Sequence, residues 1–285
     1  MDISRVCVVG GGTMGNGIAH VFALKGFEVT LVEARQDLAD KALAAIRRNL
    51  ERQAAKGVIK EDEMLAARAR VKLAVSISDA RGFHFAVEAV SEKMDLKKEI
   101  FRALEAAAAP GAILATNTSS LSITELASAV KDPSRVIGMH FMNPVPVMKL
   151  VEIIRGLQTS DETCGIVREL SLKLGKTPAV AGDFPGFVSN RVLMPMINEA
   201  IYCLMEGVST KEDIDTIMKL GMSHPMGPLQ LADYIGLDVC LAIMNVLHDG
   251  FADSKYRPCP LLKQMVSAGR LGVKSGRGFY EYPAK

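Results

Sequence analysis

A glycine-rich turn near the N-terminus constrains the fold of this chain more than any other feature. The apolar segment Val6–Val9 leads into the run GGGTMG at residues 10–15, and a helical pattern follows. Gly10, Gly12 and Gly15 fit the spacing G-x-G-x-x-G. In this motif the first glycine permits a tight turn, the second lets a pyrophosphate approach the backbone, and the third lets the helix pack on the strand. The turn predicts an α/β sheet that binds phosphate at its first strand-to-helix connection.

An acidic residue extends this motif to a dinucleotide site. The expected second strand, Val29–Val32, is followed by Glu33, 18 residues after the last glycine of the motif. This is close to the spacing of the carboxylate that hydrogen-bonds an adenosine ribose. A carboxylate there would repel a 2′-phosphate, so NAD is favoured over NADP, although Arg35 could soften that preference. Thr13 and Met14, at the start of the helix, complete the predicted phosphate contacts.

The first half of the chain alternates apolar segments with helical patterns, which favours a parallel sheet with helices on both faces. The expected strands are Val6–Val9, Val29–Val32, Phe85–Ala89, Ile113–Ala115 and Val136–His140. A helical stretch from Asp37 to Arg70 is inserted after the second strand, and Gly57 is expected to break it into two antiparallel helices. We expect an α/β domain at residues 1–185 and an all-helical domain at 186–285.

The helical domain is predicted from apolar residues at helical spacing. A long helix is expected after Gly186, with a kink at Pro195 and an end near Gly207. The further expected helices are Lys211–Leu220, Leu229–Ile235, Val239–Leu247 and Leu261–Ala268.

The composition argues against several classes of protein. A formal net charge of +2 indicates no nucleic-acid partner. The longest uncharged stretch, Ala106–Thr124, contains Pro110, Gly111 and a polar run, and no secretory leader precedes Val6, so neither a membrane span nor export is expected. The five cysteines form no CxxC pair, which favours reduced thiols in a cytoplasmic protein without a metal site.

His140 and Glu152 form a candidate catalytic pair. His140 ends the expected strand Val136–His140, and Glu152 lies 12 residues later in the apolar run Leu150–Ile154. If the two segments lie side by side, the carboxylate can fix the imidazole tautomer while the other ring nitrogen exchanges a proton with an alcohol. The alternative is a buried histidine with a backbone partner, but a carboxylate in an apolar run is costly without a partner.

Two further polar segments are candidates for the same site. Asn117 and Ser119 follow the strand Ile113–Ala115, at the carboxyl edge where open α/β sheets bind ligands. Asn190 follows the turn DFPGF, in the first turn of the long helix and at the junction of the two domains, where its amide can donate to a substrate oxygen. Helix capping explains either segment equally well from sequence alone.

Together these segments resemble the 3-hydroxyacyl-CoA dehydrogenase family. The resemblance is carried, in order over nearly the whole chain, by GGGTMGNGIA, VEAVSEKMDLKKEIF, NTSSLSITELA, HFMNPVPVMKLVEI, DFPGFVSNR, MGPLQLADYIGLD and GRLGVKSGRGFYEY. It implies a Rossmann-type domain with a mostly parallel sheet, followed by a helical domain that mediates homodimerisation. It also implies NAD-dependent oxidation of an L-3-hydroxyacyl-CoA. The length resembles the short stand-alone form, often a 3-hydroxybutyryl-CoA dehydrogenase.

The resemblance also implies roles for individual residues. The catalytic pair of the family falls on His140 and Glu152, with Ser119 and Asn190 as further catalytic-site residues. Asn143 falls among the substrate-binding positions. The cofactor positions beyond the glycine motif and Glu33 fall on Glu92, Lys97, Asn117, Ser119 and Asn143.

A basic face on the insertion gains a candidate role from the same resemblance. Between Lys41 and Lys60 six basic residues stand against a single acid, Glu51. The family binds CoA near this helical hairpin, and Arg52 and Lys56 could hold its phosphates. A solvated helix face is the alternative.

Other dehydrogenase designs and other functions are less consistent with the sequence. No tyrosine is followed four residues later by lysine. The expected long helix after Gly186 contains no lysine, since none occurs between Lys176 and Lys211. Those absences argue against short-chain and β-hydroxyacid dehydrogenase chemistry. An enzyme acting on a free sugar acid, or a non-catalytic NAD-binding protein, remains as an alternative to the acyl-CoA dehydrogenase.

Overall fold

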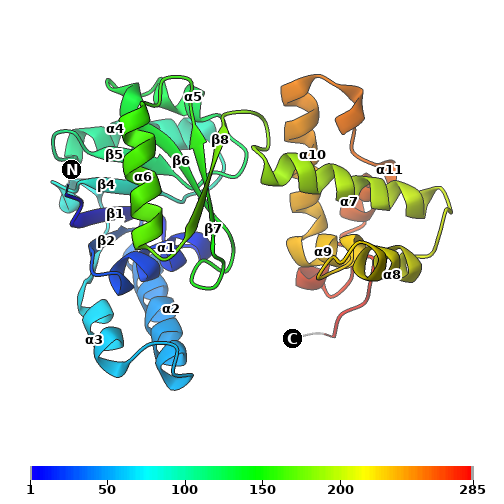
Figure 1. The fold of residues 1–285 in the computed structure, drawn as a ribbon, viewed down its shortest axis with the longest axis horizontal. Coiled ribbons are helices and arrows are strands. Elements are labelled where there is room, and N and C mark those ends of the chain that lie inside the picture. The colour runs from blue at the N-terminus through cyan, green and yellow to red at the C-terminus, as the bar shows by residue number, and fades with distance from the viewer. Residues whose placement is uncertain (1, 284–285) are drawn as a thin grey trace. The chain divides into compact units, whose positions relative to one another are not determined.

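A computed structural model describes residues 2–283 of the chain (Figure 1). The chain divides into two compact units, Met1–Asp183 and Phe184–Lys285, which are described separately. The first unit contains the sheet and its covering helices, and the second is built from helices alone.

The first unit is organised around one eight-stranded sheet. Its strand order is β3-β2-β1-β4-β5-β6-β7-β8, and every neighbouring pair is parallel except β6 and β7, which are antiparallel. The order of the first six strands is that of a dinucleotide-binding Rossmann fold, so the predicted fold class is confirmed. The strands are β1 (Arg5–Val9), β2 (Glu28–Val32), β3 (Val71–Ala74), β4 (Phe85–Glu88), β5 (Ile113–Thr116), β6 (Val136–Phe141), β7 (Leu150–Arg155) and β8 (Thr177–Gly182).

Helices cover both faces of this sheet (Figure 1). They are α1 (Thr13–Leu24), α2 (Gln36–Ala55), α3 (Glu61–Ala69), α4 (Met94–Ala107), α5 (Ile123–Ala127) and α6 (Asp161–Lys173). On one face, Phe22 of α1 and Val167 of α6 share a buried cluster with Ile137 and Met139 of β6. Gly138, between those two strand residues, faces the opposite side of the sheet, because a Cβ built on it would lie 3.1 Å from Ile123 of α5.

The insertion after β2 is a helical hairpin, as the sequence predicts. Helix α2 ends at Ala55, α3 begins at Glu61, and Gly57 in the turn between them has a φ of +67°. The inward face of α2 buries four apolar residues against the unit, namely Ala39, Ala42, Ile46 and Leu50. Its basic residues therefore lie on the outward side.

Three strands are absent from the sequence-based prediction. Strand β3 reads VKLA and buries only Val71, and β8 reads TPAVAG and has no fully buried residue. Both are edge strands with a neighbouring strand on one side only, so fewer of their side chains are buried. Neither shows a run of apolar residues. Strand β7 is recognisable only as the apolar run that contains Glu152, since nothing in the sequence fixes its pairing partner.

The second unit packs five helices around its own core. They are α7 (Ser189–Met205), α8 (Lys211–Gly221), α9 (Pro228–Ile235), α10 (Leu237–Phe251) and α11 (Pro260–Ser267), close to the predicted positions. Helix α7 contains Pro195 and buries Met194, Ile197, Ala200 and Ile201. No single helix among residues 2–283 is long and apolar enough to cross a bilayer, although α9 and α10 pass that test as a pair bent by 98°.

Candidate active site

The glycine turn between β1 and α1 has the geometry that close phosphate approach requires. Gly10 has a φ of +94°, and a Cβ on it would lie 2.7 Å from the carbonyl oxygen of Ala89. A Cβ on Gly15 would overlap the carbonyl oxygen of Gly10. By contrast, a Cβ on Gly12 would meet no atom within 4 Å. Two glycines therefore permit the tight turn and the helix packing, while the third leaves its side of the backbone open.

The start of α1 offers backbone donors to an anion. Helix α1 begins at Thr13, no side chain caps it, and its first turn contains no acidic residue. The unpaired N–H groups of a helix start, together with the helix dipole, favour a phosphate. The residues present therefore fit the pyrophosphate of a dinucleotide, and Thr13 and Met14 occupy the predicted positions.

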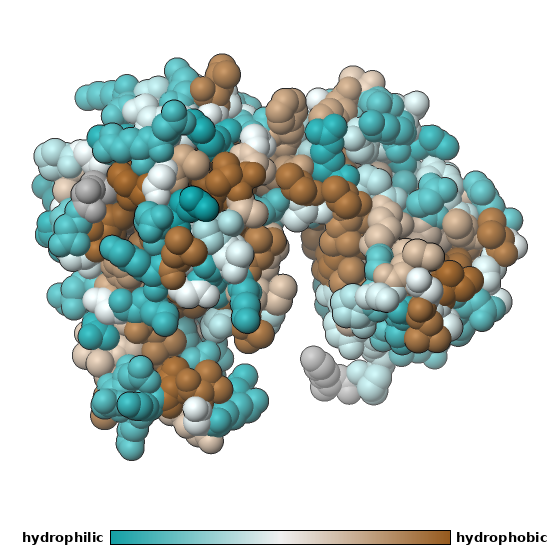
Figure 2. All heavy atoms as spheres, in the orientation of Figure 1, coloured by the Kyte–Doolittle hydropathy of each residue, from teal (hydrophilic) through white to brown (hydrophobic). Residues whose placement is uncertain are grey.

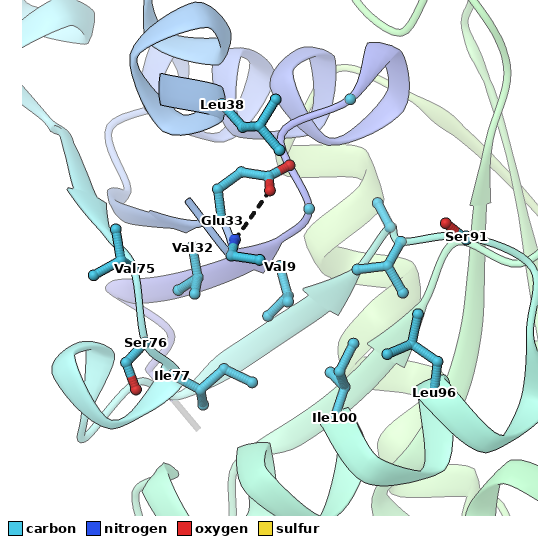
Figure 3. A pocket seen from close by; sticks show the side chains of 15 residues that line it. Val9, Val32, Glu33, Leu38, Val75, Ser76, Ile77, Ser91, Leu96 and Ile100 are labelled. Atoms are coloured by element: carbon cyan, nitrogen blue, oxygen red, sulfur yellow. Dashed lines mark hydrogen bonds between the residues drawn. The ribbon is translucent and has the colours of Figure 1, made fainter. Parts of the chain in front are cut away.

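A cavity of about 590 Å³ adjoins this turn, since Gly10 and Gly12 line it. Figure 3 shows the side chains around it. Its walls are mostly apolar and come from the ends of β1, β2 and β4, the segment after β3, and the helices α2 and α4; they include Leu38, Ile77 and Ile100. Glu33 supplies its carboxylate: Oε1 accepts a hydrogen bond from the N–H of Gly11 (2.6 Å) and Oε2 from that of Ala34 (3.0 Å). An apolar slot with one carboxylate suits a flat base and its ribose.

Arg35, two residues after Glu33, has its charge paired with another carboxylate, that of Asp37. Its guanidinium donates two hydrogen bonds to Asp37, at 2.8 and 2.6 Å. That pairing raises the pKa of Arg35 and lowers the pKa of Asp37. The sequence left open whether Arg35 weakens the preference for NAD, and the structure shows its charge already paired.

His140 and Glu152 meet as a cross-strand pair. They are register partners in the antiparallel ladder of β6 and β7, and His140 Nδ1 lies 2.9 Å from Glu152 Oε2. Both side chains are buried. The conditional prediction that the two segments lie side by side is confirmed. A carboxylate on Nδ1 fixes the orientation of the imidazole ring, and Nε2 is then the ring nitrogen that can exchange a proton with a substrate.

The neighbouring polar residues of the sheet edge are tied to this pair through the backbone. Asn117 Oδ1 accepts a hydrogen bond from the N–H of Phe141, the residue after His140, at 2.9 Å. Asn143 is the second residue of the loop that joins β6 to β7 and forms a cis peptide bond with Pro144. Lys176 is buried and donates to the carbonyl oxygens of Val145 and Met148 in that loop. These contacts fix the loop that carries Asn143.

Glu92, Lys97 and Ser119 are brought together by the loop after β4, the first turn of α4 and the loop after β5. Lys97 Nζ lies 3.1 Å from Glu92 Oε2, and the N–H of Ser119 donates to Glu92 Oε1 at 2.7 Å. The same lysine contacts Glu88 at 2.7 Å, an acid fully buried at the end of β4 that the sequence-based reasoning missed. In the sequence Glu88 cannot be distinguished from an exposed acid at the end of a strand. The signal that identifies it is its contact with the buried Lys97, which only the structure shows.

The remaining predicted residues lie on other elements. Asn190 is in the first turn of α7, in the helical unit. Arg52 is in the last turn of α2, and Lys56 is its C-terminal cap residue. Within residues 2–283 neither of these basic side chains forms an ion pair with an acid of the chain, whereas Lys41 pairs with Asp37. Helix capping after β5 is performed by Ser122, whose side chain accepts from the N–H of Glu125, and not by Ser119.

Comparisons with known proteins agree with this geometry. Residues 5–184 match the 3-hydroxyacyl-CoA dehydrogenase NAD-binding domain, and residues 186–282 match the C-terminal domain of the same family. A probable 3-hydroxybutyryl-CoA dehydrogenase of Bacillus subtilis is 54% identical over 285 residues, which is all of this chain and 99% of that protein. The human mitochondrial hydroxyacyl-coenzyme A dehydrogenase is 41% identical, over 98% of this chain and 91% of its own length.

A solved structure shows the same similarity in three dimensions. The crystal structure of (S)-3-hydroxybutyryl-CoA dehydrogenase from Ralstonia eutropha superposes with a TM-score of 0.97 at 48% identity, covering 99% of this chain and all of that one. Both domain matches and both full-length relatives point to one family and one cofactor. The chain belongs to the 3-hydroxyacyl-CoA dehydrogenase family, a family of NAD-dependent oxidoreductases.

Proposed function

We propose that the protein catalyses the reversible oxidation of an L-3-hydroxyacyl-CoA to the 3-ketoacyl-CoA, with the short-chain 3-hydroxybutyryl-CoA as its preferred substrate. The observation that carries the chemistry is the buried pair of His140 and Glu152, 2.9 Å apart. The chain length of the substrate rests on the relatives named as 3-hydroxybutyryl-CoA dehydrogenases, which match along nearly their entire length.

In the proposed mechanism His140 acts as the general base. Its Nε2 removes the proton of the 3-hydroxyl group, and in the reverse direction the imidazolium returns a proton to the ketone oxygen. Glu152 accepts the hydrogen bond from Nδ1 and offsets the positive charge that forms on the ring. Bound NAD supplies the acceptor of the hydride that leaves C3.

Other residues position the reactants. The pyrophosphate would be held by the turn at Gly10, Gly12 and Gly15 and by the first residues of α1, Thr13 and Met14. Glu33 would accept hydrogen bonds from the ribose hydroxyls. Glu92, Lys97 and Asn117 would lie at the nicotinamide half, because all three are at the carboxyl edge of β4 and β5. The proposed hydrogen-bonding partners of the substrate oxygens are Ser119, Asn143 and Asn190.

The proposed site for CoA is the outward face of α2. Arg52 and Lys56 lie at its C-terminal end without a carboxylate partner among the described residues, so both cations remain available to phosphate groups. Electrostatic binding of this kind should weaken as salt is raised.

We also propose a homodimer formed through residues 186–285, with residues 1–185 binding the cofactor. The helical unit exposes hydrophobic side chains that its own core does not use, visible as brown patches among polar residues in Figure 2. They include Val192, Val208, Ile217, Leu220 and Met222. Exposed apolar surface of this kind is typical of protein interfaces. All five cysteines are free thiols, which supports a reducing compartment such as the cytoplasm.

The test of the substrate is steady-state kinetics with 3-ketoacyl-CoAs of four to sixteen carbons, each with NADH and with NADPH. We expect the highest kcat/KM for acetoacetyl-CoA with NADH and a decline with chain length. Free hydroxy acids serve as the control. A higher kcat/KM for a free acid than for any acyl-CoA would contradict the proposal.

A further inference from the structure

Glu88 is a charged residue in the interior of the sheet unit. Its side chain is fully buried at the carboxyl end of β4. Oε1 accepts hydrogen bonds from Lys97 Nζ and from the N–H of Val90, both at 2.7 Å, and Oε2 accepts one from the hydroxyl of Thr116, also at 2.7 Å. A buried carboxylate is costly unless it is paired and hydrogen-bonded. Three partners from three segments satisfy that requirement and fix the carboxylate in one orientation.

The contacts of Glu88 continue outward to the loop after β5. Lys97 is 1% exposed and touches a second carboxylate, Glu92 Oε2, at 3.1 Å. Glu92 Oε1 in turn accepts from the hydroxyl of Thr118 (2.9 Å) and the N–H of Ser119 (2.7 Å). A continuous series of polar contacts therefore links the interior of β4 to the polar loop that contains Ser119.

The charges of this cluster do not cancel. Two carboxylates, Glu88 and Glu92, share one ammonium group, Lys97, so the cluster carries a net charge of −1. The next lysine on α4, Lys98, is paired with Glu125 and is no further counter-ion. The Glu92 side chain is 39% exposed, so the excess negative charge lies on the outer side of the cluster.

The cluster lies in the half of the sheet that receives the nicotinamide. Ala89, Val90 and Ser91, which follow Glu88 directly, line the same cavity as Glu33. A dinucleotide spans the crevice at the carboxyl edge, with one nucleotide on the half that contains β1 and β2 and the other on the half from β4 to β6. Glu33 marks the adenosine half, so the nicotinamide belongs to the half of β4. The nicotinamide ring is positively charged in the oxidised cofactor and neutral in the reduced one.

We propose that Glu88 is a positioning residue that holds Lys97 and Glu92 as a cluster of net charge −1, and that this charge favours binding of NAD⁺ relative to NADH. The inference rests on cofactor binding and not on the identity of the acyl substrate. A charge near the ring changes the affinity for the cationic form much more than that for the neutral form, since only the cation interacts with it as a full charge. The cluster therefore sets the ratio of the two dissociation constants.

The experiment compares the wild type with Glu88→Gln, which keeps the size of the side chain and removes its charge. The Kd for NADH is measured from the fluorescence of the reduced cofactor and the Kd for NAD⁺ by calorimetry, both without acyl-CoA. We expect Kd(NAD⁺)/Kd(NADH) to rise by about threefold to tenfold. Glu162→Gln neutralises an exposed acid on α6, away from the cavity that Glu33 lines, and should leave the ratio unchanged.

A second pair of variants separates charge from structure. Glu88→Gln combined with Lys97→Met restores a net charge of −1, so its ratio should return towards the wild-type value. If Glu88→Gln is unfolded at the assay temperature, Glu92→Gln makes the same change of charge in a part-exposed residue and must raise the ratio. Equal weakening of both cofactors in the folded Glu88→Gln protein, or an unchanged ratio, would overturn the proposal. Because acyl-CoA is absent, an error in the proposed substrate would not affect either outcome.

Discussion

Both units of the molecule bury carboxylates, but they give them different partners. In the sheet unit Glu152 contacts a histidine and Glu88 a lysine, so each buried acid faces a side chain that can exchange or hold a proton. In the helical unit Asp215 accepts from the N–H groups of Leu229 and Gln230 at the start of α9. Burial of charge therefore does not by itself identify a catalytic site.

Asp233 illustrates the architectural use of a buried acid. It accepts from the N–H groups of Phe279 and Tyr280 at 2.9 Å and from the hydroxyl of Tyr282 at 3.1 Å. These bonds hold the C-terminal segment against α9. Burial raises the pKa of Asp233, and the two tyrosines beside the aspartates also have raised pKa values. For the buried acids, the comparison predicts that substitutions in the sheet unit change turnover or cofactor binding, whereas those in the helical unit change stability.

The largest expected effect is that of His140→Ala. Loss of the general base should lower kcat by about 10³-fold or more, while the Kd for NADH stays within about threefold of the wild-type value. Stopped-flow turnover and cofactor titration measure the two quantities. His248→Ala, a partly exposed histidine of the helical unit, is the control. Activity of His140→Ala within tenfold of the wild type would remove His140 from the mechanism.

Glu152→Gln should have the next largest effect. The amide keeps the shape of the side chain but cannot stabilise the imidazolium, so kcat should fall by about 10²-fold or more. The dependence of kcat/KM on pH should also shift, which a purely structural role would not produce. Glu162→Gln, an exposed acid on α6, provides a matched control. A variant with unchanged kcat and pH profile would place Glu152 with Asp233, among the structural acids.

Asp233→Asn should give the opposite result. It removes the charge that binds two backbone N–H groups and a tyrosine, and the free energy of unfolding should decrease by about 2–4 kcal/mol. Once the protein is folded, kcat should remain within about twofold. Urea unfolding and turnover at a temperature well below Tm measure both, with the exposed Asp249→Asn as the control. A large loss of kcat in a fully folded Asp233→Asn protein would contradict the division between the two units.

His20 extends the comparison to a buried base that has no carboxylate partner among residues 2–283. It is fully buried on α1, and burial lowers its pKa to about 4. Unfolded histidine titrates near pH 6.5, so between about pH 6.5 and 4 the unfolded chain binds more protons and stability is lost as the pH falls. The free energy of unfolding should decrease by about 2 kcal/mol from pH 7 to pH 5 through this residue alone. His20→Gln should remove that part of the pH dependence; identical pH dependence in both proteins would show that His20 does not contribute.

The sequence predicted the site best where chemistry and local pattern coincide. The glycine turn and Glu33 follow a fixed spacing on consecutive elements, and the turn has the predicted geometry. The contact of His140 with Glu152 could be stated only as a condition, because strand pairing depends on residues distant from both. Glu88 was missed for the same reason, since its partners Lys97 and Thr116 come from two other segments.

The edge strands show the corresponding limit for the fold. β3 and β8 have few buried side chains, so they lack the apolar run that identified the central strands. Helices were located more reliably, because their periodic apolar faces lie within one continuous segment.

The antiparallel pairing of β6 and β7 limits which insertions in the sequence this site can tolerate. The positions of His140 and Glu152 depend on a single hairpin register, and a slip of one residue would turn the Glu152 carboxylate to the other face of the sheet. Insertions within either strand would shift this register, whereas insertions within the connecting loop would leave it intact. The same loop carries Asn143 and is held by Lys176, so a change of loop length would keep the pair but displace a proposed substrate contact. The strands of the hairpin therefore fix the proposed acid–base pair, while its loop is where the proposed substrate contacts can vary.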